Sequence, residues 1–409
     1  MDSKLLPIIH PLVSGLLTEQ SSELYKLIEL FGSPLHIIFP ELLQDTIKNF
    51  QNTLKESSVN AGTIYFAAKA NKANAFQCVS ALSGIGVDVS SVQEFNEALN
   101  AGVEGDLISI SGPTKKPSLL ILALLHDAII TIDEPNELSS LIALIKKIPG
   151  KKTARITLRI SESDSSRFGM TLSEITELLS TLVKNQSLIH LEGFSFHVSG
   201  YESKTRIEMI TRACKAIEAA FTNGLHPTRI NIGGGLKVAY AHADNWDIQK
   251  ATEREFAGNV KPQFIYPYAS EVHGYEQLTE ILTESKQTVQ KTSRMIGQNI
   301  QIDIEAGRSL LDQAGISIFA VQGIRTIGKR SLLIVDGNSR SLAEFWRNSE
   351  FLIDPVHIAK SPHNNGPLTA AIASNTCLES DYLSRRFIPF KTSPQIGDFL
   401  VFLLESYML

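Results

Sequence analysis

The feature that most constrains the fold is a set of eight short runs rich in β-branched residues, which alternate with segments of helical periodicity. Apolar runs this short suit strands buried on both faces, as in a parallel sheet that helices cover. The alternation predicts a closed barrel or an open doubly wound sheet, and by itself it does not separate the two. The runs are Thr63–Lys69, Val87–Ser91, Leu107–Ser111, Ala128–Ile132, Arg155–Ile160, Glu192–Ser199, Arg229–Ile232 and Ile300–Ile304.

Helix-terminal residues separate several of these runs. Ser91 and Glu94 predict a capping box at the start of a helix, and Gly102 predicts where that helix ends. Pro135 predicts the first turn of another helix. The chain of 409 residues is long enough for a barrel of about 250 residues and a companion domain.

The pattern of predicted secondary structure changes beyond Leu311. There, strand-like segments such as ISIFAVQGI, SLLIVDG and DFLVFLL are separated by turn-rich stretches. We therefore expect a barrel over residues 36–310, a C-terminal β domain over 311–409, and an N-terminal segment, 1–35, that packs with the β domain. The connection Val238–Asn299 is much longer than the others, and long insertions on a barrel usually shape its mouth or an interface.

Composition excludes several classes of protein. The formal net charge of −5 provides no basic stripe, so we expect no nucleic-acid partner. The most apolar stretch, Ser118–Ile132, is interrupted by His126 and Asp127 and does not reach the ~18 to 20 residues of a membrane span. Pro7 and Pro11 interrupt the apolar N-terminus, which argues against a signal peptide.

The cysteines indicate a reducing compartment, and we expect a cytoplasmic protein. They are too few for a disulfide framework and too far apart for a metal knuckle. We also expect no metal site, because His190 and His197 are accompanied by no carboxylates at ligand spacing. The cysteines are Cys78, Cys214 and Cys377.

In a closed barrel, reactive groups gather at the carboxyl ends of the strands. Lys69 ends the run TIYFAAK and is either a surface lysine or an amine whose pKa is lowered by a pocket for imine chemistry. Lys72 competes for this role but lies farther along, in the loop. The strand-end candidates are Lys69, Asp88, Ser90, Arg159, His197, Ser199, Gly233, Gly234, Gly235, Glu305 and Arg308.

The segment INIGGGLK places three glycines after a strand, where bare backbone amides can approach a phosphate, although many tight turns also use glycine. Arg308 supplies a matching cation if it lies beside this loop. Glu305 forms either an ordinary salt bridge or a carboxylate that keeps a cofactor's pyridine nitrogen protonated. His197 is either a core histidine or a ring that stacks on a planar cofactor.

Taken together, these motifs resemble the fold-type III pyridoxal-phosphate enzymes, the group of ornithine, arginine and diaminopimelate decarboxylases. The resemblance extends over nearly the whole chain, up to Tyr407. It implies a TIM-like (β/α)8 barrel followed by a C-terminal β-barrel or β-sandwich domain, which resolves the ambiguity between the barrel and the open sheet. It also implies pyridoxal 5'-phosphate as the cofactor.

The resemblance implies roles for the barrel residues. YFAAKAN is similar to the family's lysine signature, so Lys69 would hold the cofactor as a Schiff base. FHVSG is similar to the family's histidine strand, so His197 would stack on the ring and Ser199 would reach the phosphate. IEAGR resembles the family's EPGR signature, so Glu305 would pair with the pyridine nitrogen and Arg308 with the phosphate, with alanine in place of the usual proline.

Further motifs extend the resemblance. Arg159 in LRI and Arg167 in SRFGM match family positions. CLESD resembles the family's CESGD, which makes Cys377 a candidate acid that serves the partner subunit's site and implies a homodimer with shared active sites. Tyr407 is similar to the family tyrosine that touches the phosphate. The match of INIGGG to the family's phosphate loop implicates Gly233, Gly234 and Gly235.

Two departures narrow the expected substrate. Leu378 stands where the diaminopimelate enzymes carry glutamate, and DGNSRSLAEFWRN has Ala343 or Glu344 where an arginine is expected. A bidentate arginine is the usual partner of a distal carboxylate, so diaminopimelate is not the expected substrate. We expect decarboxylation of a basic or specialised diamino-acid-type small molecule through an external aldimine and a quinonoid intermediate.

Two alternatives stay open on the sequence. An amino-acid racemase or epimerase of the same fold is one, although racemases of the alanine type place arginine rather than Glu305 against the pyridine nitrogen. A catalytically inactive regulator that keeps the fold as a binding surface is the other. The intact set of Lys69, Glu305, Arg308 and Cys377 argues against the inactive regulator.

Overall fold

The computed structural model describes most of the chain as two units, each defined by its internal contacts. The barrel unit comprises Leu43–Lys237 and Val272–Leu310, and the β unit comprises the chain up to Leu42, Val238–Glu271 and the chain from Leu311 on. The described residues are 4–18, 21–57, 60–148, 150, 153–242, 247, 250–263, 265–328, 330–342, 352–362 and 365–404.

Eight parallel strands form a closed barrel in the barrel unit, with β9 hydrogen-bonded to β2. Each strand overlaps one of the eight runs, so the predicted barrel is confirmed and the open sheet is excluded. The strands are β2 Asn60–Ala67, β3 Gly86–Val89, β4 Ile108–Ile110, β5 Ile129–Ile132, β6 Ala154–Arg159, β7 Ile189–Ser195, β8 Arg229–Asn231 and β9 Gln301–Ala306.

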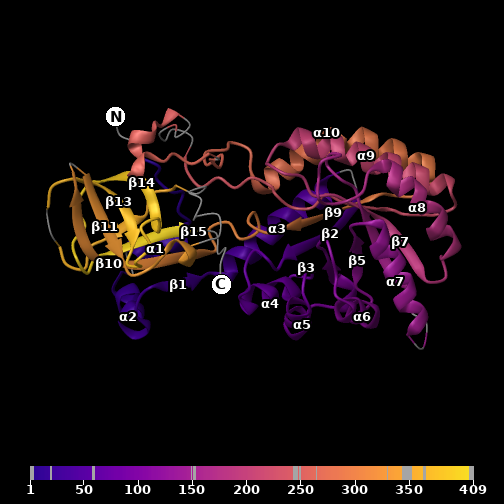
Figure 1. Cartoon of the computed structure of the whole chain (residues 1–409), viewed down its shortest axis with the longest axis horizontal. Helices are drawn as coiled ribbons and strands as arrows, with labels where there is room; N and C mark the ends of the chain where they lie inside the picture. Colours follow the sequence, from indigo (N-terminus) through magenta and orange to yellow (C-terminus); the bar gives the residue numbers. More distant parts are fainter. Residues whose placement is uncertain are drawn as a thin grey trace. The chain divides into compact units, whose positions relative to one another are not determined.

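Helices surround these strands (Figure 1). Their apolar positions recur at helical spacing, as in α8, where Ile175, Leu179 and Leu182 are the buried residues. A capping box between Thr171 and Glu174 fixes the start of that helix. The helices are α3 Pro40–Glu56, α4 Asn74–Leu82, α5 Val92–Asn100, α6 Pro117–His126, α7 Pro135–Lys147, α8 Leu172–Lys184, α9 Ser203–Thr222 and α10 Gly274–Ile296.

The capping box predicted at Ser91 is half formed. Ser91 Oγ accepts the N–H of Glu94 at 3.2 Å, as predicted. The Glu94 carboxylate accepts the N–H of Ser90 at 2.6 Å and pairs with Lys72, instead of returning to the N–H of Ser91. It therefore ties the loop after β3 to the loop after β2. The predicted end of α5 at Gly102, with φ of +93°, is confirmed.

The β unit contains a mixed sheet of seven described strands, ordered β12-β15-β10-β11-β13-β14, with β1 paired to β10. β11 and β13 are parallel, whereas the other neighbours are antiparallel. The predicted β domain after the barrel is therefore confirmed. Its strands are β1 Leu35–Ile38, β10 Gly315–Ile327, β11 Arg330–Val335, β12 Val356–Ile358, β13 Leu368–Ser374, β14 Tyr382–Phe390 and β15 Phe399–Leu404, with helices α1 Pro11–Thr18 and α2 Ser21–Phe31 in the same unit.

Two segments that the sequence boundaries placed in the barrel belong to the β unit in the structure. β1 has three of its four residues, from His36 on, within the range predicted for the barrel, and it pairs with β10. Residues 238–271 join the same unit through backbone bridges between Pro7 and Ala241 and between Phe256 and Arg386. These backbone pairings join residues far apart in the sequence, and composition and spacing gave no indication of them.

A buried ion pair links three strands toward the amino end of the barrel. Arg229 of β8 donates to Asp303 of β9 through Nε and Nη2, each at 2.8 Å, and Nη2 also donates to Thr63 Oγ1 of β2 at 2.8 Å. The N–H of Thr63 donates to Asp303 Oδ1 at 2.6 Å. Burial raises the pKa of Asp303, while the neighbouring Arg229 opposes this rise. The pair therefore joins β8 and β9 to β2, where the barrel closes.

Replacing Asp303 with asparagine should leave the Arg229 guanidinium without its carboxylate in a mostly buried position. We expect a loss of about 3 kcal/mol in the free energy of unfolding, measured by urea denaturation. The matched control is Asp45→Asn, which breaks an exposed pair with Lys48 and should cost at most about 1 kcal/mol. Equal losses in the two variants would contradict the structural role of the buried pair.

Candidate active site

The predicted site residues of the barrel unit converge at the carboxyl ends of its strands. Lys69 lies in the turn after β2, and its charge acts on Asp88 of β3 and on His197, which follows β7. Glu305 lies near the end of β9, and Arg308 follows that strand. Closure of the barrel therefore brings residues that are up to about 240 positions apart in the sequence to one face of the barrel.

Glu305 is held by hydrogen bonds from two other strands. Asn231 Nδ2 of β8 donates to Glu305 Oε1 at 2.7 Å, and Ser109 Oγ of β4 donates to the same oxygen at 3.4 Å. Within the described chain this carboxylate forms no ion pair with Arg308, so the simple salt-bridge interpretation is not supported. A carboxylate fixed in this way is oriented by its surroundings and keeps its second oxygen, Oε2, for another group.

The three glycines form a loop against which the neighbouring backbone packs closely. Gly233 donates its N–H to Asn231 Oδ1 at 2.9 Å, and Gly234 donates to His197 Nδ1 at 3.3 Å. A Cβ on Gly234 would lie 2.4 Å from the carbonyl oxygen of Glu305. Gly233 and Gly235 have φ of +67° and +74°, which side chains rarely tolerate. The loop therefore requires glycine for its packing and for its backbone conformation.

The environment of His197 favours its neutral form. The pKa of its imidazole is lowered, first because surrounding protein desolvates the charged form and then because Lys69, Arg159, Arg206 and Arg308 repel it. The hydrogen bond from Gly234 requires Nδ1 to be an acceptor, and the neutral ring meets that requirement. A neutral, fixed imidazole is suited to stacking on a planar ring.

Asp88 of β3 is a buried carboxyl group, with 1% of its surface exposed. Ser111 Oγ donates to its Oδ2 at 3.0 Å, whereas Oδ1 has no hydrogen-bond partner in the described chain. Burial raises the pKa of Asp88 well above its ordinary value; Glu305 adds to the rise, and Lys69 opposes it. Asp88 therefore holds a proton more readily than a carboxyl group in water does.

The remaining barrel candidates surround the same face. Arg159 pairs with Asp133 at 2.9 Å and lies 4.6 Å from the ring centroid of Phe168. Arg308 Nη2 donates to the hydroxyl of Tyr201 at 2.6 Å. The N–H of Ser199 donates to Glu162 Oε2 at 2.9 Å.

Arg206, which the sequence analysis did not single out, lies behind the glycine loop. It belongs to α9, is fully buried, and donates to the carbonyl oxygens of Gly234 at 2.9 Å and Gly235 at 2.7 Å. Asn231 was also missed, although it contacts both the loop and Glu305. Its position at the end of a strand, two residues before GGG, was the one available indication in the sequence.

The predicted site residues outside the barrel unit belong to the C-terminal part of the chain. Cys377 lies in the β unit between β13 and β14 and is exposed. Tyr407 lies outside the described residues, as do Ala343 and Glu344.

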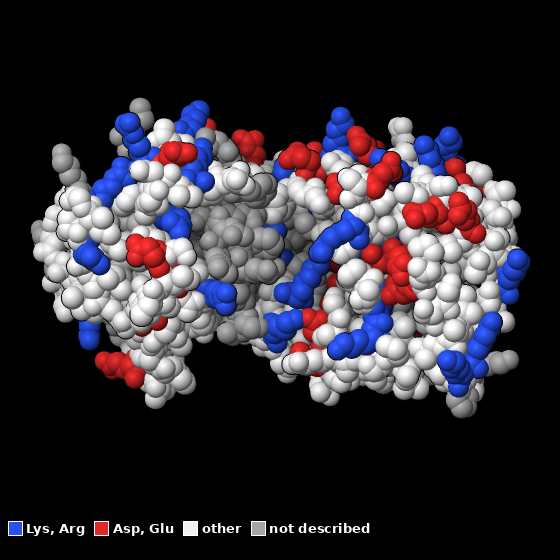
Figure 2. All heavy atoms as spheres, viewed as in Figure 1, with Lys and Arg blue, Asp and Glu red and all other residues white. Residues whose placement is uncertain are grey.

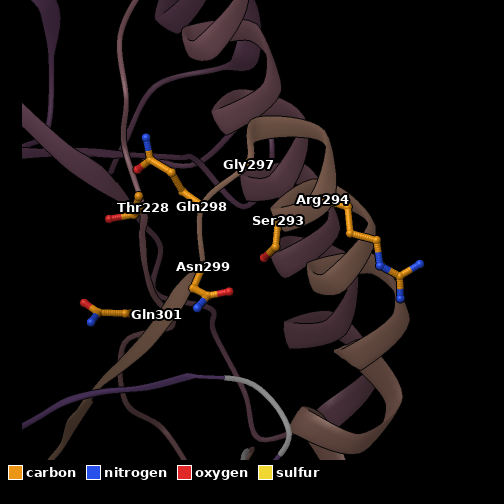
Figure 3. Close-up of a pocket in the computed structure, with 7 residues that line it drawn as sticks. All are labelled: Thr228, Ser293, Arg294, Gly297, Gln298, Asn299 and Gln301. Carbon is orange, nitrogen blue, oxygen red and sulfur yellow. The ribbon is translucent and has the colours of Figure 1, made fainter.

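Other surface features lie away from this site. A polar pocket of about 650 Å³ is lined by Thr228, which precedes β8, and by Gln301, which begins β9 (Figure 3). It is therefore at the amino ends of the strands, opposite the face where barrel enzymes place their reactive groups. Basic and acidic side chains are interspersed over the face of the barrel unit seen in Figure 2. None of the described helices is long and apolar enough to cross a membrane.

A family model described as the pyridoxal-binding domain of pyridoxal-dependent decarboxylases matches residues 43–311. The chain belongs to this family. It is a pyridoxal-phosphate-dependent carboxy-lyase, and its cofactor is pyridoxal 5'-phosphate. The expectation of a decarboxylase of this group is confirmed.

Similar proteins span nearly the whole chain. The protein y4yA of Sinorhizobium fredii is 30% identical over 402 residues, which cover 97% of this chain and 88% of that protein. Diaminopimelate decarboxylase of Bacillus methanolicus is 23% identical over 376 residues, with coverage of 88% and 80%.

Solved structures share the fold. Diaminopimelate decarboxylase of Helicobacter pylori, complexed with L-lysine, is 17% identical with a TM-score of 0.74 and covers 94% of this chain and 90% of that chain. Lysine/ornithine decarboxylase of Vibrio vulnificus, complexed with putrescine, is 16% identical with a TM-score of 0.70 and coverage of 96% and 95%.

The residues on the carboxyl face fit the family's cofactor. The glycine loop leaves no room for a Cβ at Gly234 and supplies backbone amides, which are suited to a phosphate. Glu305 presents a fixed carboxylate, and Lys69 an amine, on the same face. An aldehyde, a ring nitrogen and a phosphate thus each find a group of complementary chemistry.

The raised pKa of Asp88 predicts how pH affects stability. A carboxyl group whose pKa is higher in the folded state contributes stability at low pH and loses it as the pH rises through that folded value. Asp88→Asn should therefore stabilise the cofactor-free protein at neutral pH relative to wild type, by about 1.4 kcal/mol for each pKa unit of the rise.

Urea unfolding of the cofactor-free protein across a series of pH values measures this difference. The gap between Asp88→Asn and wild type should widen as the pH rises and shrink in acid. The control is Asp164→Asn at an exposed position, which should follow wild type throughout. Parallel profiles for Asp88→Asn and wild type would show that Asp88 titrates normally in the folded protein.

Proposed function

We propose that this enzyme removes the α-carboxylate from a basic or specialised diamino-acid-type substrate. The observation that carries the proposal is the Glu305 carboxylate, fixed by Asn231 and Ser109 on the same barrel face as the Lys69 amine. Bound pyridoxal phosphate supplies an electron sink for the electron pair that remains when carbon dioxide leaves.

Each barrel residue has a role that its contacts support. Lys69 would hold the cofactor covalently through its ε-amine. Glu305 would keep a proton at the pyridine nitrogen, which is the protonation state that decarboxylation requires. The neutral ring of His197 would lie flat against the cofactor, and Arg159 adds positive charge nearby.

The phosphate would be held by groups of three kinds. The loop Gly233–Gly235 supplies the N–H of Gly235, since the N–H groups of Gly233 and Gly234 already donate to Asn231 and His197, and Arg308 supplies a charged donor. Ser199 and Tyr407 would supply hydroxyl groups, as the family resemblance implies. In the structure the N–H of Ser199 donates to the Glu162 carboxylate, so its hydroxyl is the group that would reach the phosphate.

Cys377 would act in the partner subunit's site, where its thiol would return a proton to the substrate α-carbon. The exposure of Cys377 in the β unit leaves this thiol accessible to another chain. We therefore propose a homodimer with shared active sites. We place it in the cytoplasm, where reducing conditions keep the thiol available.

The substrate class rests on charge and on the relatives. Ala343 or Glu344 stands where the family resemblance implies an arginine, so a second carboxylate on the substrate would lack that partner. Solved structures of similar fold are described as complexes with L-lysine, putrescine and cadaverine, which all carry a terminal amine. A basic distal end is therefore the proposed feature of the substrate.

Racemisation and a purely regulatory role have less support. An arginine at the position of Glu305 would favour racemisation, and the chain has a carboxylate there instead. The combination of Lys69, Glu305 and the glycine loop on one face argues against a protein that only binds. Racemisation of a single enantiomer without release of carbon dioxide would reverse this ranking.

Carbon dioxide release across basic amino acids, diamino acids and their conjugates tests the proposal. We expect release from at least one of them, and Lys69→Ala should lower kcat by roughly 10² to 10⁴-fold, since it removes the covalent amine and a proton-transfer group. Lys72→Ala is the matched control, because Lys72 pairs with Glu94 in the next loop, and it should keep most of the activity. Lack of release from every substrate would defeat the proposal.

Subunit complementation tests the shared site. Cys377→Ala and Lys69→Ala should each be nearly inactive alone, with kcat lowered by roughly 10²-fold or more. Mixed after dissociation, they form heterodimers with one site that has both residues, and random pairing predicts about a quarter of wild-type activity. No recovery in a mixture that contains heterodimers would place both residues in one chain's site.

A further inference from the structure

Arg206 is a buried cation that contacts the glycine loop from behind. It is 0% exposed. Its Nη2 donates to the carbonyl oxygens of Gly234 at 2.9 Å, Gly235 at 2.7 Å and Gly200 at 3.3 Å, and its Nη1 donates to that of Glu202 at 3.2 Å. One guanidinium therefore joins the first turn of α9 to two successive peptide groups of the loop.

No carboxylate within the described chain forms an ion pair with Arg206. Its partners are carbonyl oxygens, and its Nε has no hydrogen-bond partner among the residues that the structure describes. Burial lowers the pKa of Arg206 to about 10, against the opposing influence of Glu162, Tyr201 and Glu202. The group therefore still carries its charge at neutral pH. Charges this deeply buried are ordinarily balanced by a counter-charge, and here a bound anion can provide one.

The loop itself presents free donors. The N–H groups of Gly235 and Leu236 donate to no acceptor in the described chain, although Leu236 is only 4% exposed. Buried backbone N–H groups almost always have a partner. These two amides therefore point to a ligand that carries hydrogen-bond acceptors.

The free donors and the contacts of Arg206 belong to the same peptide groups. The carbonyl of Gly234 shares a peptide unit with the N–H of Gly235, and the carbonyl of Gly235 shares one with the N–H of Leu236. Both units are trans, so each N–H points away from the carbonyl that Arg206 binds. Holding the two carbonyls therefore aims the two N–H groups toward the opposite side of the loop.

The same contacts should also strengthen the amides as donors. A cation that binds a carbonyl oxygen polarises the whole peptide group, and hydrogen bonds in series reinforce one another. The close approach depends on glycine, because a Cβ on Gly235 would lie 2.6 Å from Arg206 Nη2. The contacts of Arg206 with the loop therefore require glycine at position 235.

We propose that Arg206 is a positioning residue for the cofactor's phosphate. It binds the carbonyls of Gly234 and Gly235, directs the N–H groups of Gly235 and Leu236 at the phosphate, and supplies a positive charge behind the loop. This inference rests on the proposed role of the glycine loop as the phosphate site.

Binding of pyridoxal phosphate and of pyridoxal to the cofactor-free, full-length protein separates this role from a general structural one. The two ligands share the aldehyde and the ring, and pyridoxal lacks the phosphate. Arg206→Met should weaken pyridoxal phosphate roughly 10- to 100-fold, the effect of losing a hydrogen bond to a charged group, and should change pyridoxal affinity by less than about threefold.

Two further variants sharpen the comparison. Arg206→Lys keeps the charge but cannot bridge two carbonyls, so it should give an intermediate loss that is again specific to pyridoxal phosphate. Lys204→Met removes an equal charge from an exposed position of the same helix and should leave both affinities unchanged. If Arg206→Met does not fold, Arg206→Lys decides the question.

Equal weakening of both ligands by the Arg206 variants, or no weakening of either, would overturn the proposal. A different variant, Lys69→Ala, tests the proposed function independently of Arg206. Lys69→Ala should weaken pyridoxal phosphate and pyridoxal alike, because both carry the aldehyde. If Lys69→Ala affects neither ligand, the lysine assignment fails, whatever the Arg206 variants show.

Discussion

Closure of the barrel between β9 and β2 is the constraint on which the site depends. The parallel register pairs Glu305 with Tyr65, four residues before Lys69, although the two segments are far apart in the sequence. The buried pair of Arg229 in β8 and Asp303 in β9 lies toward the amino end of the barrel, where Arg229 also binds Thr63 of β2. An open sheet of the same elements would leave β2 and β9 as edges, and Lys69 and Glu305 would lie at opposite ends of it.

Asn231 connects the two halves of the site that closure brings together. Its amide oxygen accepts the N–H of Gly233, while its amide nitrogen donates to Glu305. The loop and the carboxylate are therefore fixed relative to each other by one side chain at the end of β8. On the other side of the loop, Arg206 fixes the carbonyls of Gly234 and Gly235. The backbone amides are thus preorganised, which reduces the reorganisation that binding an anion would require.

The distribution of charge divides the site into two regions. Lys69, Arg159, Arg206 and Arg308 all lower the pKa of His197, so positive charge dominates around the imidazole and the glycine loop. Asp88 and Glu305 supply the negative charge of the site, and burial, followed by the charge of Glu305, raises the pKa of Asp88. A phosphate is favoured in the first region, and a protonated ring nitrogen or an amine in the second.

Much of this arrangement could be predicted from local sequence. Strand ends are recognisable from β-branched runs, so Lys69, His197, the glycines and Glu305 were found by position. Arg206 was missed because an arginine in a helix such as SKTRIEMITR gives the same local pattern whether it is buried or, like Arg212, exposed. The segment 238–271 was assigned to the barrel because backbone bridges leave no pattern in the sequence. The capping box at Ser91 was predicted in full, but the Glu94 carboxylate binds the N–H of Ser90 and pairs with Lys72 of the neighbouring loop.

The most direct test of the account is to reduce the holoenzyme with borohydride, digest it and map the peptide that carries the cofactor. A cofactor held covalently at the carboxyl end of β2 predicts a single labelled peptide that contains YFAAKAN, with the modification on Lys69. A label on Lys72 or on any other lysine, or a protein that binds the cofactor and acquires no label, would contradict the central claim.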